Sequence, residues 1–284
     1  MKNIKLLLLL AVVSLTTVSC STKKENSKEG ETSKPKMLVL YYSQLGNTKS
    51  VAEEIANRLS ADMEEIVMVN PYDTAFQATI DRCKQEREQG IIPDIQPVRA
   101  DLAQYDIIFL GYPVWFGTYA PPVAQFLNSA DLSGKKIVPF CTFGSGGLES
   151  SVKDLVAAEP DAEILSGYGV RAARLEAMPK EIDDFLKANG FLDGEYAKLE
   201  EFSEQHEVSE SETAIFDAAV EGYPMIHAKA KSVAVRTIPE GTEYLFTAVT
   251  LPREDKPDMP PAGEIQVYVT VADGSAPVFT KVIR

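Results

Sequence analysis

Apolar runs alternate with amphipathic segments between residues 37 and about 192. Residues 37–42 form a continuous apolar run, which is the pattern of a strand buried on both faces. Residues 47–59 then place Val51, Ile55 and Leu59 on one face, as in a helix. The same patterns predict further strands at 63–69, 107–111, 136–141 and 162–168, and further helices at 74–87, 121–127, 148–157 and 179–188. Strands that alternate with helices predict an α/β fold with a five-stranded, parallel, doubly wound sheet.

The C-terminal quarter shows the alternation of antiparallel strands. Residues 232–238 and 244–251 alternate on either side of Pro239-Glu240-Gly241 and predict a hairpin. Residues 265–271 alternate as well, and Asp273-Gly274 turns them into a strand at 278–283. A helix is expected from Ser211 to Val220, ahead of these strands.

This pattern predicts a small α+β domain at 213–284, with one helix on an antiparallel sheet, after a glutamate-rich linker at 195–212. The first part of that linker is expected to be helical. The outline resembles cystatin-like domains, but their protease-blocking turn is not visible in the sequence, so inhibition is not carried over. The proline-rich stretch 253–262 fits a long connection or a contact site.

The first 36 residues have the character of a targeting segment. Lys2 and Lys5 precede an apolar run at 6–13, as in a secretory signal. The sequence Thr17-Val18-Ser19-Cys20 resembles the lipobox of bacterial lipoproteins, in which the cysteine is acylated. We therefore expect a signal peptide at 1–20 and a disordered tether at 21–36, with an exported protein held by lipid at a membrane of a bacterial cell envelope. The periplasmic and surface faces both remain open. The alternative is an ordinary cleaved signal that carries a chance cysteine.

Composition narrows the range of partners. The chain of 284 residues has a formal net charge of −14, which argues against nucleic acid as a partner, because phosphate binding needs a basic surface. Three cysteines are too few for a disulfide scaffold, and Cys83 and Cys141 are interpreted as free thiols. Two histidines give no reason to expect a metal centre.

Three loops fall at the carboxyl ends of predicted strands, where parallel sheets of this kind bind ligands. The first loop combines hydroxyl, amide and glycine residues: Ser43, Gln44, Leu45, Gly46, Asn47 and Thr48. Together with the free amides at the start of a helix, it would hold a phosphate dianion. No lysine directly follows the glycine, and no G-x-G-x-x-G is present, which argues against a nucleoside triphosphate or a dinucleotide. The alternative is a set of residues that only cap the helix and form the turn.

The second loop is rich in aromatic residues, and the third is rich in glycine. The second runs from Gly111 to Tyr119 and holds the only tryptophan of the chain, within the stretch Pro113, Val114, Trp115, Phe116 and Gly117. Its aromatic side chains would stack on a flat heteroaromatic ligand, or else pack under the following helix. The third loop has glycines that allow a close backbone approach: Thr142, Phe143, Gly144, Ser145, Gly146 and Gly147. The alternative for this loop is a mobile linker.

Taken together, the three loops describe a site for a mononucleotide with a flat ring, and residues 37–194 resemble the flavodoxin family. Ser43-x-x-Gly46-Asn47-Thr48 resembles its phosphate loop, although Leu45 stands where a threonine is usual. Residues 111–117 resemble the flavin loop of a subgroup with G-x-P-x-W, and residues 142–146 resemble the loop at the polar edge of the ring. The resemblance implies a flavodoxin-like sheet and a non-covalently bound FMN.

The resemblance implies a protein that relays electrons between FMN and an unidentified redox partner protein, with no catalytic residue of its own. Residues 37–194 hold 13 basic and 23 acidic residues, which would disfavour extra negative charge on the flavin. The Gly117 backbone would be free to rearrange and offer its carbonyl to the ring.

Two other functions stay open. One is an NAD(P)H-dependent quinone or nitro-compound reductase on the same fold. Its second nucleotide would need a phosphate site, for which the sequence offers Lys135, Lys136, Arg171 and Arg174. The other is a scaffold without a cofactor.

Overall fold

The computed structural model describes residues 34–223, 225–252 and 263–284. The predicted signal peptide, Cys20, nearly all of the tether and the proline-rich stretch 253–262 lie outside the described residues. In the ranges that are described, none of the helices has the length and apolar character needed to cross a bilayer.

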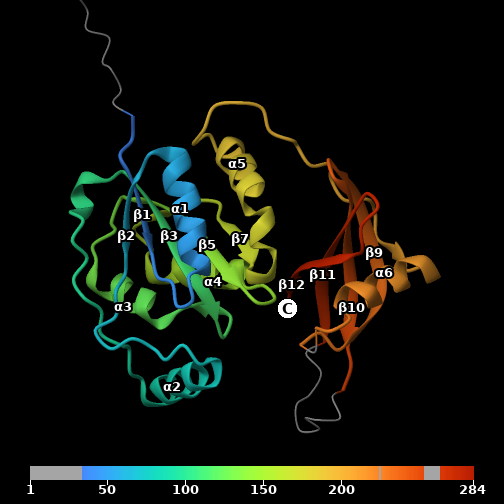
Figure 1. Ribbon diagram of the computed structural model, residues 1–284, viewed down its shortest axis with the longest axis horizontal. Helices are drawn as coiled ribbons and strands as arrows, with labels where there is room; N and C mark the ends of the chain where they lie inside the picture. Colours follow the sequence, from blue (N-terminus) through green and yellow to red (C-terminus); the bar gives the residue numbers. More distant parts are fainter. Residues whose placement is uncertain (1–33, 224, 253–262) are drawn as a thin grey trace, which may run out of the picture. The chain divides into compact units, whose positions relative to one another are not determined.

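The N-terminal sheet is parallel, with the strand order β2-β1-β3-β5-β6. Figure 1 shows β2, β1, β3 and β5 side by side in this order. A further strand, β7, pairs with β5 beyond β6, and β4 forms an antiparallel hairpin with the end of β3. The strands are β1 (Met37–Tyr41), β2 (Asp62–Glu65), β3 (Ile107–Trp115), β4 (Thr118–Tyr119), β5 (Lys136–Phe143), β6 (Glu163–Ile164) and β7 (Tyr168–Arg171). Since the winding reverses between β1 and β3, the carboxyl ends of these two strands are where a ligand is expected.

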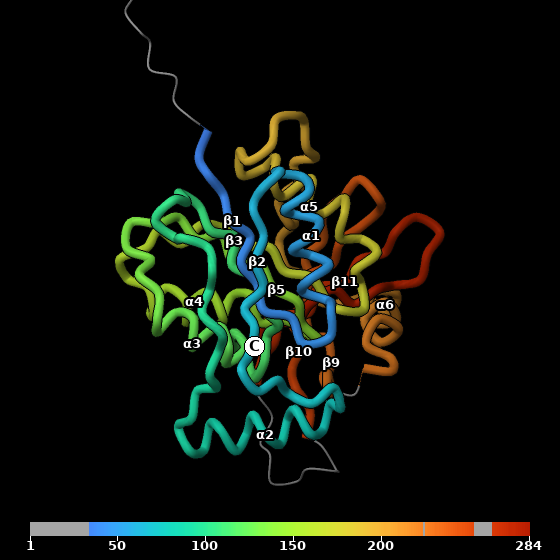
Figure 2. Tube along the Cα trace, turned by 60° about the vertical axis from the view of Figure 1, so that its left-hand side comes forward, coloured from blue at the N-terminus to red at the C-terminus, as the bar shows by residue number. Residues whose placement is uncertain are grey.

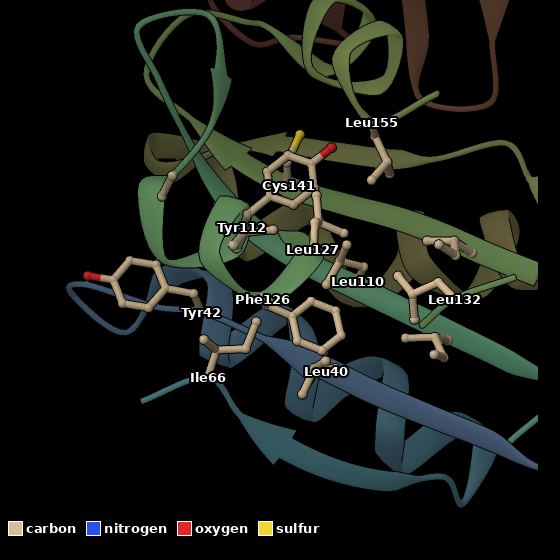
Figure 3. Close-up of a cluster of buried hydrophobic side chains, with 14 of the residues drawn as sticks. Leu40, Tyr42, Ile66, Leu110, Tyr112, Phe126, Leu127, Leu132, Cys141 and Leu155 are labelled. Carbon is tan, nitrogen blue, oxygen red and sulfur yellow. The ribbon is translucent and has the colours of Figure 1, made fainter. Parts of the chain in front are cut away.

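Helices cover both faces of this sheet: α1 (Asn47–Leu59) and α5 (Met178–Ala188) on one, and α3 (Pro121–Ser129) and α4 (Leu148–Ala158) on the other. Alternate side chains of β1 enter different cores, because Leu38 and Leu40 pack toward α3 while Val39 and Tyr41 pack toward α1. This explains the unbroken apolar run. Figure 2 shows α1 beside α5, and Figure 3 shows Leu40 among the buried side chains of the α3 face.

Proline explains why the predicted strand 162–168 is two short strands. β6 pairs with β5 at Lys136 and Ile137, and β7 pairs with β5 only from Phe140 onward. Pro139 lies between the two ladders and has no N–H to donate, so the pairing is interrupted there. The prediction of one continuous strand was wrong for this reason.

Helix α2 (Phe76–Gln89) follows β2 and begins two residues later than predicted. Two short 3₁₀ helices, η1 (Leu102–Gln104) and η2 (Ala172–Ala177), complete this part of the chain. Both cysteines of the described chain, Cys83 and Cys141, are free and buried. Burial raises the pKa of both thiols, which keeps them in the neutral, unreactive form at neutral pH.

The C-terminal sheet is antiparallel, in the order β12-β11-β10-β9-β8, and α6 (Glu210–Val220) packs on it. Its strands are β8 (His206–Glu207), β9 (Ala228–Ile238), β10 (Gly241–Thr250), β11 (Glu264–Ala272) and β12 (Val278–Ile283). The α+β prediction is confirmed. The prediction of a helix in the first part of 195–212 was wrong, and residues 195–205 form neither helix nor strand. A capping box between Ser209 and Glu212 starts α6 one residue earlier than predicted.

Candidate functional site

The three predicted loops meet around one cavity of about 1020 Å³ at the carboxyl ends of β1, β3 and β5. Of the sixteen candidate residues at 43–48, 113–117 and 142–146, all but Gly46 line it: Ser43, Gln44, Leu45, Asn47, Thr48, Pro113, Val114, Trp115, Phe116, Gly117, Thr142, Phe143, Gly144, Ser145 and Gly146. Gly147 of the third loop lines it as well. A cavity of this size is at the upper end of the range for small-molecule sites. The sequence prediction that these loops form a common site therefore agrees with the geometry.

The loop after β1 is folded as an anion cradle. Gly46 adopts a left-handed backbone conformation with φ of 89°, which lets α1 begin at the next residue. Ser43 Oγ accepts hydrogen bonds from the amides of Gly46 (3.1 Å) and Lys49 (3.2 Å). Within the described residues, the amides of Asn47 and Thr48 have no acceptor and stand at the positive end of the helix dipole.

A hydroxyl pair joins this cradle to the third loop. Thr48 Oγ1 lies 2.8 Å from Thr142 Oγ1, and both side chains are buried. The loops after β1 and β5 are thus fixed relative to each other. Free amides, hydroxyls and a helix start in one rigid turn fit a phosphate dianion.

The second loop is more regular than predicted. β3 continues as a strand to Trp115, and Phe116 and Gly117 form a tight turn into β4 with φ of 52° and 84°. Two successive positive φ values suit the twist of a two-residue hairpin. The prediction that Gly111 starts a loop was wrong, since β3 keeps pairing with β5 as far as Pro113.

The aromatic residues of this segment divide between core and cavity. Tyr112 is fully buried, contacts Tyr119 edge to face, and lies 3.2 Å from Ser151 Oγ, so it belongs to the core. Trp115 lines the cavity and is positioned by edge contacts to Tyr72 (5.1 Å between ring centroids) and Tyr42 (6.1 Å). The expectation of core packing is confirmed for Tyr112, whereas stacking of Trp115 on a flat ligand stays a prediction.

The third loop is anchored rather than loose. Thr142 and Phe143 are the buried last residues of β5. The carbonyl of Gly144 accepts from Arg171 Nε (3.0 Å) and from the Tyr223 hydroxyl, and the carbonyl of Ser145 accepts from the Val282 amide (2.7 Å). These bonds argue against a mobile linker.

The sequence analysis missed Glu149, Ser150 and Lys153 of α4 and Ala172, which also line the cavity. Two further groups of cavity residues were missed. One comes from α2 and the residues before it: Thr74, Phe76, Thr79, Ile80 and Cys83. This group could have been predicted, because α2 follows β2 of the same sheet and ligands bind at the carboxyl ends of such strands. The other group comes from the C-terminal part: Tyr223, Met225, Val282, Ile283 and Arg284. No local pattern indicated that it would reach the cavity.

The four basic residues considered for a second nucleotide do not gather. Lys135 donates to the Tyr105 carbonyl (2.8 Å), Lys136 pairs with Glu163 (3.7 Å), and Arg174 pairs with Glu181 (2.8 Å). Arg171 is buried and bonded to backbone carbonyls. None of the four lines the cavity, whose basic lining residues in the described chain are Lys153 and Arg284.

Comparison with known proteins identifies the family. A family model described as flavodoxin matches residues 36–181, which is just over half of the chain. The chain belongs to the flavodoxin family. This confirms the resemblance and the doubly wound fold inferred from the three loops and the alternating strands.

Solved structures similar to this flavodoxin cover about half of it. A candidate flavoprotein from Bacteroides eggerthii is 26% identical, with a TM-score of 0.49, over 54% of this chain and 97% of that one. A candidate flavoprotein from Bacteroides uniformis is 27% identical, with a TM-score of 0.47, over 52% and 98%. A flavoprotein from Lactobacillus acidophilus, solved in complex with FMN, is 25% identical, with a TM-score of 0.44, over 48% and 93%.

FMN is the cofactor of the flavodoxin family, and the residues of this site fit it. The preformed cradle at 43–48 suits its phosphate, and Trp115 offers a positioned aromatic surface for a flat ring. The backbone of Gly144–Gly146 provides polar groups beside that surface. The cofactor predicted from the sequence is therefore confirmed.

Leu45 marks a place where phosphate binding can be improved. Its side chain is 62% exposed and lines the cavity where the family usually has a threonine. We expect Leu45→Thr to bind FMN about three- to tenfold more tightly, because a hydroxyl donor is gained at little cost. Fluorescence titration of the apoprotein measures this. Leu45→Val is the control, since it has the same branching without the hydroxyl; equal gains in both variants would contradict the explanation.

Proposed function

We propose that this flavodoxin is an FMN-dependent electron-transfer lipoprotein that relays electrons between redox partners at the cell envelope. The observation that carries the proposal is the convergence of the three loops on one cavity, whose lining includes Asn47 and Thr48, with their free amides, and Trp115. Bound FMN supplies reversible one-electron chemistry. The protein binds the cofactor, orients it and sets the charge around it.

Charge favours one-electron transfer. Residues 37–194 carry 23 acidic and 13 basic residues, so an additional negative charge on the bound cofactor is opposed by the surrounding field. The turn at Gly117 would also influence the charge state of the bound flavin, because Gly117 lines the cavity and its carbonyl could turn toward the ring. In the structure this carbonyl accepts a hydrogen bond from Ser150 Oγ. A rearrangement of this turn toward the cofactor would have to give up that bond.

The reductase alternative finds less support. Hydride transfer from NAD(P)H needs a place for a second nucleotide and its phosphates. The residues considered for this role are engaged elsewhere, in ion pairs or in bonds to backbone carbonyls. A protein partner that exchanges electrons through the cavity mouth needs no such site.

Stepwise reduction of the purified protein tests the relay. We expect a yellow protein whose visible spectrum changes in two separate one-electron stages. Steady-state oxidation of NADPH in the presence of a quinone would instead establish the reductase. A colourless preparation that takes up no added FMN would overturn both.

The lipid anchor is the second part of the proposal, and the sequence around Cys20 supports it. We expect Cys20→Ala to move the protein from the membrane fraction to the soluble fraction of cells, because a single acylated residue at the start of the mature chain would be its attachment. Ser21→Ala, which keeps the cysteine, should remain with the membrane. Equal partitioning of the two variants would refute the anchor.

A further inference from the structure

The backbone of the third loop is in direct contact with the C-terminal module, defined here as residues 206–284 in their described part. The Val282 amide donates to the Ser145 carbonyl at 2.7 Å, and the Tyr223 hydroxyl donates to the Gly144 carbonyl. At Gly146 a Cβ atom would lie 2.1 Å from the Val282 carbonyl oxygen, so only glycine allows this approach. Loop and β12 therefore meet backbone to backbone.

Arg171 joins the two parts with a single guanidinium group. Nε donates to the Gly144 carbonyl at 3.0 Å, and Nη1 donates to the Phe279 carbonyl on β12. Its Cζ lies 4.6 Å from the ring centroid of Tyr223 and 4.3 Å from that of Phe279. Arg171 is buried. Within the described residues it pairs with no carboxylate. A buried charge is costly unless its hydrogen bonds are made, so the contact between loop and module is stable only while Arg171 keeps its carbonyl and ring partners.

The same contact reaches the cavity. Tyr223, Val282 and Ile283 line it from the C-terminal side, beside the loop that they bind. Lys281 and Glu149 form an ion pair (2.7 Å) next to this region, between β12 and the start of α4. The cavity thus has one wall built from residues far along the chain from the three loops.

We propose that the C-terminal module is a wall of the flavin site, and that docking of the module and binding of FMN strengthen each other. The inference rests on the proposed function, since it takes FMN as the occupant. Both events use the conformation of Gly144–Gly146, so a ligand that prefers the docked loop also tightens the docking by the same factor. Arg171 and Tyr223 are positioning residues for the loop.

Hydrogen exchange of the full-length protein tests the coupling. We expect FMN to slow exchange of the Val282 amide by about tenfold or more, because this amide donates to the Ser145 carbonyl and is protected only while the module is docked. The hairpin β9–β10 has its own ladder and serves as the internal reference, with no change expected. Unchanged exchange of the Val282 amide in a protein that does bind FMN would overturn the inference.

A matched pair of arginine variants tests it from the loop side. Arg171→Met keeps the length of the side chain and removes both bonds, so FMN affinity should fall about tenfold and the Val282 amide should lose its protection. Arg174→Met removes only the pair with Glu181 and should leave both unchanged. Equal behaviour of the two variants would overturn the inference.

Tyrosine variants keep the test valid if Arg171→Met does not fold. Tyr223→Phe removes only the hydroxyl that binds Gly144, and we expect about threefold weaker FMN binding with faster exchange of the Val282 amide. Tyr244→Phe, in the same module and outside the cavity, is the control with no change expected.

If the unmodified protein binds no FMN, the proposed function fails together with the inference. If it binds FMN without these effects, only the inference fails.

Discussion

Ser43→Asp should lower the affinity for FMN by at least about 100-fold. The new carboxylate would occupy the position where Ser43 Oγ now meets the amides of Gly46 and Lys49, at the edge of the phosphate cradle. A carboxylate and a phosphate dianion within a few ångströms repel each other by several kcal/mol at the effective dielectric of a protein surface, about 4 kcal/mol per pair of unit charges at 4 Å. Titration of the apoprotein, followed by flavin fluorescence, gives the affinity.

Riboflavin separates the phosphate effect from damage to the rest of the site. Because riboflavin has no phosphate, the wild-type protein and Ser43→Asp should bind it with similar affinity. The fold should survive, since an acidic side chain at a helix start is stabilising by about 0.3–1 kcal/mol. Ser43→Asn, a neutral side chain of the same shape, should lose no more than about tenfold. Parallel losses for FMN and riboflavin would contradict a phosphate cradle at 43–48.

Gly111→Ala should destabilise the N-terminal sheet by about 2–3 kcal/mol. A Cβ at this position would lie 2.1 and 2.3 Å from two ring atoms of Phe140, its partner on β5. Phe140 is fully buried, so its ring can make room only by disturbing the α1–α5 core. Overpacking of a dense core carries a cost of this size. Chemical denaturation, followed by circular dichroism, measures it.

A second substitution, Phe140→Leu, controls for a general effect of the change at Gly111. A smaller side chain at position 140 removes the overlap, so the loss caused by Gly111→Ala should shrink when it is measured in a protein that already carries Phe140→Leu. The cost of the Gly111 change must therefore depend on the side chain at position 140. If it is the same with and without Phe140→Leu, the steric explanation is wrong.

Local patterns of apolar residues were sufficient to predict elements whose burial leaves a clear period in the sequence. The apolar run at 37–42 and the helical spacing at 47–59 gave β1 and α1 almost residue for residue, because burial on both faces and on one face leaves distinct periods. The strand-end rule then brought the three loops to one cavity.

The errors have a common physical cause, which is a partner distant in sequence. Gly111 and Pro113 are poor strand residues by themselves, yet β3 continues through them because β5 pairs alongside. Pro139 divides the last strand of the sheet through its missing donor, which only the pairing reveals. In the sequence, Gly146 was compatible with a mobile linker. In the structure, its missing side chain makes space for Val282, 136 positions away, and no sequence pattern near residue 146 indicates this contact.

The bond between Ser145 and Val282 has a consequence for the order of assembly. A chain that is synthesised or exported from its N-terminus can form the parallel sheet and the phosphate cradle before residues 279–283 have emerged. The wall that these residues provide is then the last part of the site to arrive. If docking and FMN binding are coupled as proposed, the chain would hold its cofactor firmly only once residues 279–283 have folded against the loop, and retention of the cofactor would then report a complete chain.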